Sequence, residues 1–228
     1  MIAITKQENK RTPKIARERE EIKAARKLVH DNYVQAGLID PIPTGLHLTP
    51  FDTSPLTQVF IVKQPDDAVV STLSLIEDQA NGIPMEAIYP DEIKHLRQRD
   101  ERFAEISCLA SQDRQGLIPA LAIMYHFAQA ARIQHLLIAV HPHHAAYYER
   151  FHGFERFGRM RPYRTVKENP AIGLIHDINM WARSETKCKS YKQVVYDYAF
   201  SEAELIRHEM SQEDRTYFRQ SMLRHVHS

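Results

Sequence analysis

A glutamate within an apolar segment is the residue of this chain best suited to do chemistry. The segment Ala104-Glu105-Ile106-Ser107-Cys108-Leu109-Ala110 has the composition of a buried strand, and a polar turn and a helical pattern follow it. A carboxylate in such a place can serve as a general base that removes a proton from an attacking nucleophile. The alternative is a charge on an edge strand that pairs with an arginine, because structural ion pairs also occur in clefts. Glu105 is therefore the first candidate for a catalytic group.

Two other motifs look reactive, but ordinary explanations fit them better. No His/Asn partner motif accompanies Cys108, and an apolar strand raises the pKa of a thiol, so we expect a buried structural cysteine and not a nucleophile. The run His141-Pro142-His143-His144 has no nearby carboxylate and does not match a standard zinc-ligand spacing, so we expect no metal site. These histidines are either surface side chains or groups at a strand end that face a substrate.

The bulk properties describe one ordinary globular domain. A chain of 228 residues can bury one core, and a formal net charge of +1 is no reason to expect a nucleic-acid partner. The two cysteines, Cys108 and Cys188, cannot form a disulfide framework, which favours the reducing cytoplasm. No apolar run approaches the ~20 residues of a membrane-spanning helix, so we expect no transmembrane segment.

The elements expected around Glu105 follow from hydrophobic periodicity. In chain order we expect a helix over 15–36, a strand hairpin over 57–63 and 68–76, a surface helix over 89–99, the Glu105 strand, a helix over 117–132, a strand over 136–140, a helix over 144–151, and strands over 154–163 and 171–180. This order predicts a mixed α/β (α+β) fold with a central sheet flanked by helices.

The segments outside these elements define the expected boundaries. Residues 1–14 are polar and without periodicity, so we expect a flexible N-terminus before the main domain over 15–182. Residues 183–228 are expected to form a C-terminal helical extension, because Ser201–Glu204 and Ser211–Asp214 have the form of helix-capping boxes. The Pro-rich stretches 40–45 and 49–55 predict an ordered surface excursion that could cover a binding site.

Several separated motifs, taken in order, carry a family resemblance. They are Pro55-Leu-Thr-Gln-Val-Phe60, Gly82-Ile-Pro-Met85, Ala104 to Ala110, Ala139-Val-His-Pro-His-His144, Tyr147-Tyr148 leading to Gly153-Phe154, and Tyr163 through Pro170-Ala171. With them the chain resembles the GNAT acyltransferase superfamily, and within it the N-acyl amino acid synthases, which are relatives of the acyl-homoserine-lactone synthases. The resemblance implies a GNAT acyl-CoA N-acyltransferase-like fold with a central mixed sheet.

The resemblance also implies a reaction. A long-chain fatty acyl group would pass from a phosphopantetheine thioester, on an acyl carrier protein, to the α-amino group of an amino acid, with no tightly bound cofactor. Because an amine is mostly protonated at neutral pH, Glu105 would remove a proton directly or through a water. Tyr148 would protonate the leaving thiolate; the alternative is that its ring only packs in the core. Ser107, His141 and Phe60 are expected to contact the substrates.

The donor is expected to bind where the Glu105 strand diverges from the strand over 136–140. There Cys108, Leu109 and Ala110 would bind the thioester arm through their backbone groups. In the turn that follows, Arg114, Gln115 and Gly116 could hold a single phosphate, but this turn lacks the Gly-rich pattern of coenzyme-A-dependent relatives. That departure favours a carrier-protein donor. Cys108 replaces the Arg that lactone synthases carry at this position, which argues against a lactone product.

Other functions remain open at this point. One is an acyl-CoA-dependent N-acetyltransferase of a small amine, and another is a non-catalytic protein that binds acyl chains or acyl carrier protein. The basic residues between Lys10 and Lys27 could dock an acidic carrier protein, or they could form ion pairs along a solvated helix.

Overall fold

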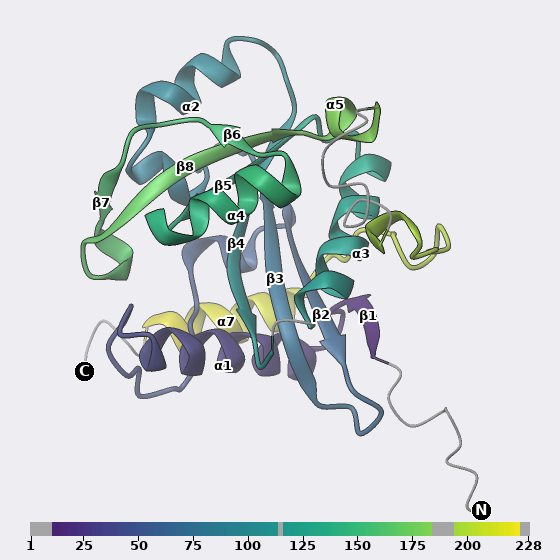
Figure 1. The fold of residues 1–228 in the computed structure, drawn as a ribbon. Helices are drawn as coiled ribbons and strands as arrows, with labels where there is room; N and C mark the ends of the chain where they lie inside the picture. Colours follow the sequence, from purple (N-terminus) through teal and green to yellow (C-terminus); the bar gives the residue numbers. More distant parts are fainter. Residues whose placement is uncertain (1–10, 114–115, 184–193, 224–228) are drawn as a thin grey trace, which may run out of the picture.

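One eight-stranded sheet organises the chain, and helices cover both of its faces (Figure 1). The computed structural model describes residues 11–113, 116–183 and 194–223. The strands are β1 (Thr12–Ile15), β2 (Thr57–Lys63), β3 (Val69–Glu77), β4 (Phe103–Ser111), β5 (His135–Val140), β6 (Glu155–Arg156), β7 (Arg161–Tyr163) and β8 (Asn169–Asp177). The longer helices are α1 (Arg19–Gln35), α2 (Pro90–Arg97), α3 (Leu117–Ala130), α4 (Pro142–His152), α5 (Ile178–Arg183) and α7 (Gln212–Leu223), and the short 3-10 helices are η1 (Pro50–Thr53), η2 (Pro84–Ala87) and η3 (Arg164–Val166).

The strand order is β1-β2-β3-β4-β5-β8-β6, and β7 pairs with β8. Neighbouring strands are antiparallel except for β4 and β5, which are parallel. The crossover between these two strands is α3, because a parallel pair needs a connection that returns the chain to the same end of the sheet. The structure thus confirms the mixed sheet flanked by helices.

Two layers of side chains fill the space between the sheet and its helices. On one face, α3 and α4 pack on the sheet through the largest core cluster, in which Phe60 and Phe127 meet edge to face. On the other face, α1 packs against β2, β3 and β4, and η2 and α2 contribute a separate cluster around Tyr89. Alternate residues of β4 therefore face different helices, and Glu105 faces the side of η2.

Most of the predicted elements are confirmed with small shifts of their ends. The β2–β3 hairpin, β4, α3 and β5 lie where the periodicity indicated, and α4 ends at Gly153, whose φ of 68° is the left-handed conformation that glycine adopts without strain. Within the described residues, no helix has the length and apolar character to cross a membrane.

The predicted start of the first helix is wrong. Thr12–Ile15 form an edge strand that pairs antiparallel with Phe60–Lys63, so Ile15 belongs to the sheet. The helix begins at Arg19, after a capping box in which Glu18 and Glu21 bond to each other's backbone. Ile15 fits the helical spacing by coincidence, because a single apolar residue cannot distinguish a buried strand from a helix.

The second half of the sheet also differs from the prediction. Residues 154–163 form two short strands, β6 and β7, and the chain leaves the sheet between them, where a side chain on Gly158 would collide with the ring of Tyr89. The strand predicted over 171–180 ends at Asp177, since Ile178 begins α5. Ser201 and Glu204 make the bonds of a capping box but form a turn without a helix.

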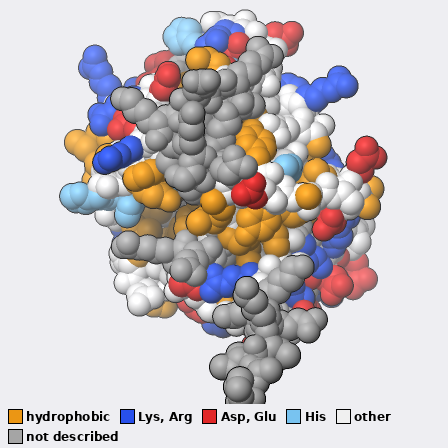
Figure 2. Space-filling model, turned by 45° about the vertical axis from the view of Figure 1, so that its right-hand side comes forward, with side chains coloured by type: hydrophobic (Ala, Val, Ile, Leu, Met, Phe, Trp, Pro, Cys, Tyr) orange, Lys and Arg blue, Asp and Glu red, His pale blue; other side chains and the backbone are white. Residues whose placement is uncertain are grey.

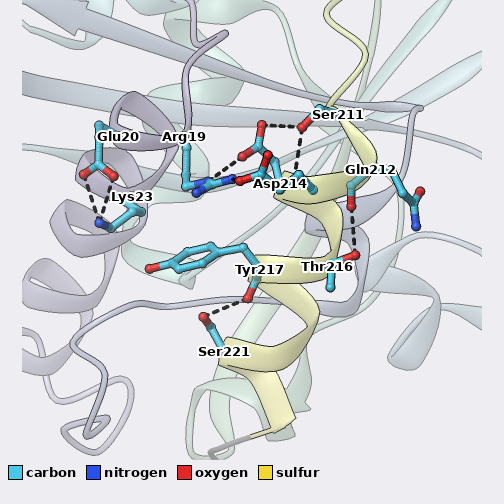
Figure 3. A network of polar contacts seen from close by, with 10 residues as sticks. Arg19, Glu20, Lys23, Ser211, Gln212, Asp214, Thr216, Tyr217 and Ser221 are labelled. Atoms are coloured by element: carbon cyan, nitrogen blue, oxygen red, sulfur yellow. Dashed lines mark hydrogen bonds and ion pairs between the residues drawn. The ribbon is translucent and has the colours of Figure 1, made fainter.

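The C-terminal segment packs back onto the domain. Phe218 of α7 is fully buried against Ile22, Ala25, Val59 and Ile61. Arg19 of α1 bonds to Asp214 at 2.5 Å, and the ring of Tyr217 lies beside it (Figure 3). Ser211 caps α7 through Asp214, as its capping box indicated.

The face that carries α3 is turned forward in Figure 2, where hydrophobic side chains gather at the centre. The described part of the C-terminal segment places Tyr196, Tyr198, Phe200 and Leu205 against the largest core cluster. Residues 194–223 are therefore integral to the packing of the domain.

Candidate active site

Glu105 lies in the interior with a single hydrogen-bond partner among the described residues. The side chain is 2% exposed, and its Oε2 accepts a hydrogen bond of 2.7 Å from the backbone N–H of Met85 in η2. Burial raises the pKa of Glu105 to about 8, and the Met85 hydrogen bond offsets only part of that effect. The expected alternative, an ion pair with an arginine, is not what the structure shows. Such a carboxyl group can take up a proton near neutral pH.

The sheet opens at Glu105. Among the described residues, the pairing of β4 with β5 runs from Phe103 to Glu105, which lies opposite Leu137, and stops there. Beyond this point β5 continues to pair with β8 alone as far as Val140. The edge of β4 that faces β5 is therefore without a strand partner after Glu105, as predicted, and its backbone groups are available to a ligand.

A β-bulge changes the direction of the side chains that follow Glu105 in β4. Cys108 and Leu109 lie together opposite Leu73, and Cys108 has a φ of 50°, which is uncommon for any residue other than glycine. Because the bulge interrupts the alternation of the strand, consecutive side chains of Ser107 and Cys108 both line the same cavity. Leu109 instead packs against the core cluster on the α3 face.

This cavity, of about 630 Å³, is lined mainly by apolar and aromatic groups. Its walls come from the end of α1, the Pro-rich loop, the η2 segment, β4 and the β7–η3 segment: Tyr33, His47, Leu48, Thr49, Pro50, Phe51, Asn81, Ile83, Pro84, Glu86, Ala87, Ser107, Cys108, Tyr163, Thr165 and Val166. Its size and composition are typical of a small-molecule site. Thr49, Pro50 and Phe51 of the second Pro-rich stretch line this cavity, so the predicted excursion adjoins a candidate binding site.

Burial favours the neutral forms of several titratable groups at the cavity, whereas the ion pair with Arg97 lowers the pKa of Glu86 and keeps it a carboxylate. Burial, with the nearby Arg26 guanidinium, lowers the pKa of His47 to about 4. Burial raises the pKa of Tyr33 and of Cys108 above their ordinary values. The charge of Arg26 is matched by Asp52, with which it forms a fully buried ion pair behind the cavity wall. Cys108 is therefore a buried thiol, as predicted.

In the turn after β4, a carboxylate of the protein itself, that of Asp113, bonds to the start of α3. The Asp113 carboxylate accepts a hydrogen bond of 2.9 Å from the N–H of Gly116 at the start of α3, and it forms an ion pair with Arg11. Gly116 thus lies at the predicted helix N-terminus, but its N–H already has a carboxylate partner. Arg114 and Gln115, the other predicted phosphate ligands, lie outside the described residues. Ala110 faces α1.

Three further predicted residues lie away from the cavity lining. Tyr148 is half-buried on α4, its ring packs on Phe154, and burial raises its pKa to about 12. Phe60 is fully buried in the core. His141 caps α4 by accepting a bond from the N–H of His143. Among the described residues, no group of three or more His, Cys, Asp or Glu could hold a metal ion.

Tyr33 and Tyr163 are site residues that the sequence reasoning missed. Tyr33 falls within the helix expected over 15–36, and Tyr163 begins one of the motifs that carry the family resemblance. Neither position carries a local signal, because each reaches the cavity through the packing of α1 or β7. A tyrosine at the end of an element that adjoins a predicted binding loop is the one clue that the sequence offered.

Comparisons with known proteins agree with this geometry. A family model described as N-acyl amino acid synthase FeeM matches residues 24–177. No curated protein sequence matches the chain. Among solved structures, FeeM, an N-acyl amino acid synthase from uncultured soil microbes, is 26% identical with a TM-score of 0.71, over 78% of this chain and 96% of FeeM.

Two more distant structures share the fold. One is BjaI, a CoA-dependent acyl-homoserine lactone synthase solved with SAM and isopentyl-CoA, with 14% identity and a TM-score of 0.59 over 93% of this chain and all of BjaI. The other is an N-acetyltransferase described as putative from Lactobacillus plantarum, with 14% identity and a TM-score of 0.53 over 75% of this chain and 99% of that protein. The fold is that of GNAT-like acyltransferases.

Proposed function

The chain belongs to the N-acyl amino acid synthase FeeM family and is an N-acyltransferase, and from this premise we propose its substrates. The donor is a long-chain fatty acyl group on the phosphopantetheine arm of an acyl carrier protein. The acceptor is the α-amino group of an amino acid, and the product is an N-acyl amino acid. The observation that carries the proposal is the position of Glu105 at the point where β4 and β5 separate, two residues before Ser107, which lines the cavity.

Glu105 can perform the proton transfer that the reaction needs. Its Oε2 is held by Met85, and within the described residues its Oε1 has no hydrogen-bond partner. The amine binds as an ammonium ion, whose positive charge favours the carboxylate form of Glu105. Glu105 then takes one proton, the amine nitrogen attacks the thioester carbon, the carbon–sulfur bond breaks to release the thiolate, and the new amide nitrogen loses its second proton to solvent. Tyr148, on the opposite face of the sheet, is the proposed proton donor to that sulfur.

The turn before α3 supports a carrier-protein donor. Coenzyme A would bring a diphosphate to this helix N-terminus, where relatives bind anions with backbone N–H groups. Here the Asp113 carboxylate occupies the N–H of Gly116 and neutralises Arg11. A second negative group at this place meets repulsion from Asp113. A phosphopantetheine arm carries a single phosphate that remains near the surface of its carrier protein.

A reconstituted assay tests the proposal. Purified protein is incubated with long-chain acyl carrier protein and a mixture of amino acids, and products are identified by mass spectrometry; parallel reactions contain long-chain acyl-CoA or acetyl-CoA as donor. We expect N-acyl amino acids with the carrier-protein donor. Acetylated amines from acetyl-CoA alone would instead identify a small-amine acetyltransferase. Binding of the acyl carrier protein without any product would identify a non-catalytic binding protein.

A further inference from the structure

Tyr163 lines the cavity but has no role in the acyl transfer proposed above. Resting on the proposed function, we propose that Tyr163 is a further catalytic residue on the acceptor side: its hydroxyl oxygen accepts one N–H of the acceptor ammonium group while Glu105 takes the proton of another. The two side chains together direct the nitrogen lone pair at the thioester carbon.

The position of Tyr163 follows from three adjacent elements. It is the last residue of β7 and the residue before η3, and its side chain lines the cavity together with Ser107 and Cys108. Ser107 follows Glu105 by two residues on β4, so both side chains face the same side of the sheet. Tyr163 thus reaches the cavity from β7, on the face of the sheet to which β4 turns the side chains of Glu105 and Ser107.

One segment of the chain holds both residues in place. Met85 of η2 binds the Glu105 carboxylate through its N–H. In α2, which follows η2, Glu92 forms an ion pair of 2.7 Å with Arg161, two residues before Tyr163. The carbonyl of Ile88 accepts a further bond from Arg161. A catalytic pair that is supported from a common rigid segment keeps the fixed geometry that positioning of a reactant requires.

A second set of hydrogen bonds connects the η2–α2 segment to β8, the strand that pairs with β7. The hydroxyl of Tyr89, between η2 and α2, accepts a bond of 2.8 Å from the N–H of Gly173, and its single proton is shared between the carbonyls of Arg159 at 2.8 Å and Ala171 at 3.1 Å. Ala171 lies directly opposite Arg161 in the β7–β8 ladder. The position of Tyr163 relative to Glu105 is thus fixed from both β7 and β8.

The chemistry of a phenol suits this task. Burial raises the pKa of Tyr163, and the negative charge of Glu105 adds to that effect, so the hydroxyl stays neutral throughout the working pH range. A neutral hydroxyl contacts the side chain of Thr165 and still has a lone pair for an N–H donor. Tyr163 keeps its own proton; Glu105 receives the first amine proton, the carbon–nitrogen bond forms, the thiolate departs, and the amide nitrogen releases its second proton to solvent.

Steady-state kinetics of Tyr163→Phe test this role. The variant keeps the ring, so its melting temperature and its KM for acyl carrier protein should match those of the unmodified protein. We expect kcat/KM for the amino acid to fall by about 10- to 100-fold, the range of a lost hydrogen bond to a charged group. Tyr198→Phe, whose ring stacks on Phe200 outside the cavity lining, is the matched control and should retain full activity.

The outcomes separate this inference from the proposed function. If the unmodified protein makes N-acyl amino acids and Tyr163→Phe has an acceptor kcat/KM within about twofold of it, the role of Tyr163 is wrong while the function stands. A fall in melting temperature or a raised KM for the acyl carrier protein, in parallel with the activity loss, would also overturn the role, because it would place the hydroxyl in the fold or the donor site. An inactive unmodified protein would contradict the function itself.

Discussion

The Glu105 carboxylate accepts a hydrogen bond from the backbone N–H of Met85, from a 3-10 helix twenty residues earlier in the chain. The bond holds one carboxylate oxygen on the cavity side of the sheet. It also places the acid where β4 and β5 separate. The proposed base is therefore positioned by η2, and its proton affinity is set by burial.

Replacement of Glu105 by Gln should lower kcat by about 10²-fold or more, the contribution of a general base. The amide can still accept the Met85 hydrogen bond, so the fold should be retained. Acyl transfer from acyl carrier protein is the measurement, and Glu149→Gln, at a surface ion pair with Arg156, is the control. Full activity of Glu105→Gln across the pH range would exclude Glu105 as the base.

The raised pKa of Glu105 predicts a pH dependence of stability. The folded protein retains a proton up to about pH 8 that the unfolded chain releases near its ordinary pKa of 4.5. Stability contributed by this group should therefore decline as the pH rises from 4.5 to 8, by on the order of 5 kcal/mol. Urea denaturation at a series of pH values checks this, and Glu105→Gln should remove that part of the decline. Parallel curves for the two proteins would show that burial does not raise this pKa.

Cys108→Ala should retain acyl transfer within about twofold, because a buried thiol with a raised pKa is a poor nucleophile. Loss of the small buried side chain should cost about 1 kcal/mol of folding free energy. The test is activity together with a denaturation curve. An inactive but folded variant would show that the Cys108 thiol takes part in acyl transfer.

Asp113→Asn should improve turnover with acyl-CoA. Removal of one negative charge near a bound diphosphate is worth about 1 kcal/mol at 4 Å in water, hence roughly a fivefold lower KM for the coenzyme A thioester. Stability should change by less than about 1 kcal/mol, since the Arg11 ion pair is partly exposed. Asp91→Asn, an exposed acid of α2, is the control. An unchanged KM would show that Asp113 has no part in the choice of donor.

Phe218→Ala should destabilise the domain by about 3–5 kcal/mol, because the ring is fully buried between α7, α1 and β2. Chemical denaturation measures this, with Tyr217→Phe, which keeps its ring against Arg19, as a milder comparison. A loss below about 1 kcal/mol would mean that the C-terminal segment is not part of the cooperative fold.

Local patterns were enough to predict most of the fold. The β2–β3 hairpin, β4, α3, β5 and α4 each combine one periodicity with clear turn residues, and these signals act within a few residues. Ser201–Glu204 shows the limit, since capping bonds form there without a helix. A cap satisfies the first N–H groups of a helix, but it does not supply the buried face that makes a short helix stable.

By itself the sequence determined the candidate acid, the strand that carries it and the loop beside the candidate site. Glu105 is a candidate because a carboxylate is unusual in an otherwise apolar strand. This can be read from the sequence without knowing which residues contact it. Only the tertiary structure decided that Met85 holds this acid and that Tyr163 and Tyr33 line one cavity with Ser107. The bulge that turns Ser107 and Cys108 to one side was also unpredictable, since a positive φ at Cys108 has no sequence signal. Burial, and with it the pKa of Glu105, arises from segments that are remote in the chain and meet only in the folded protein.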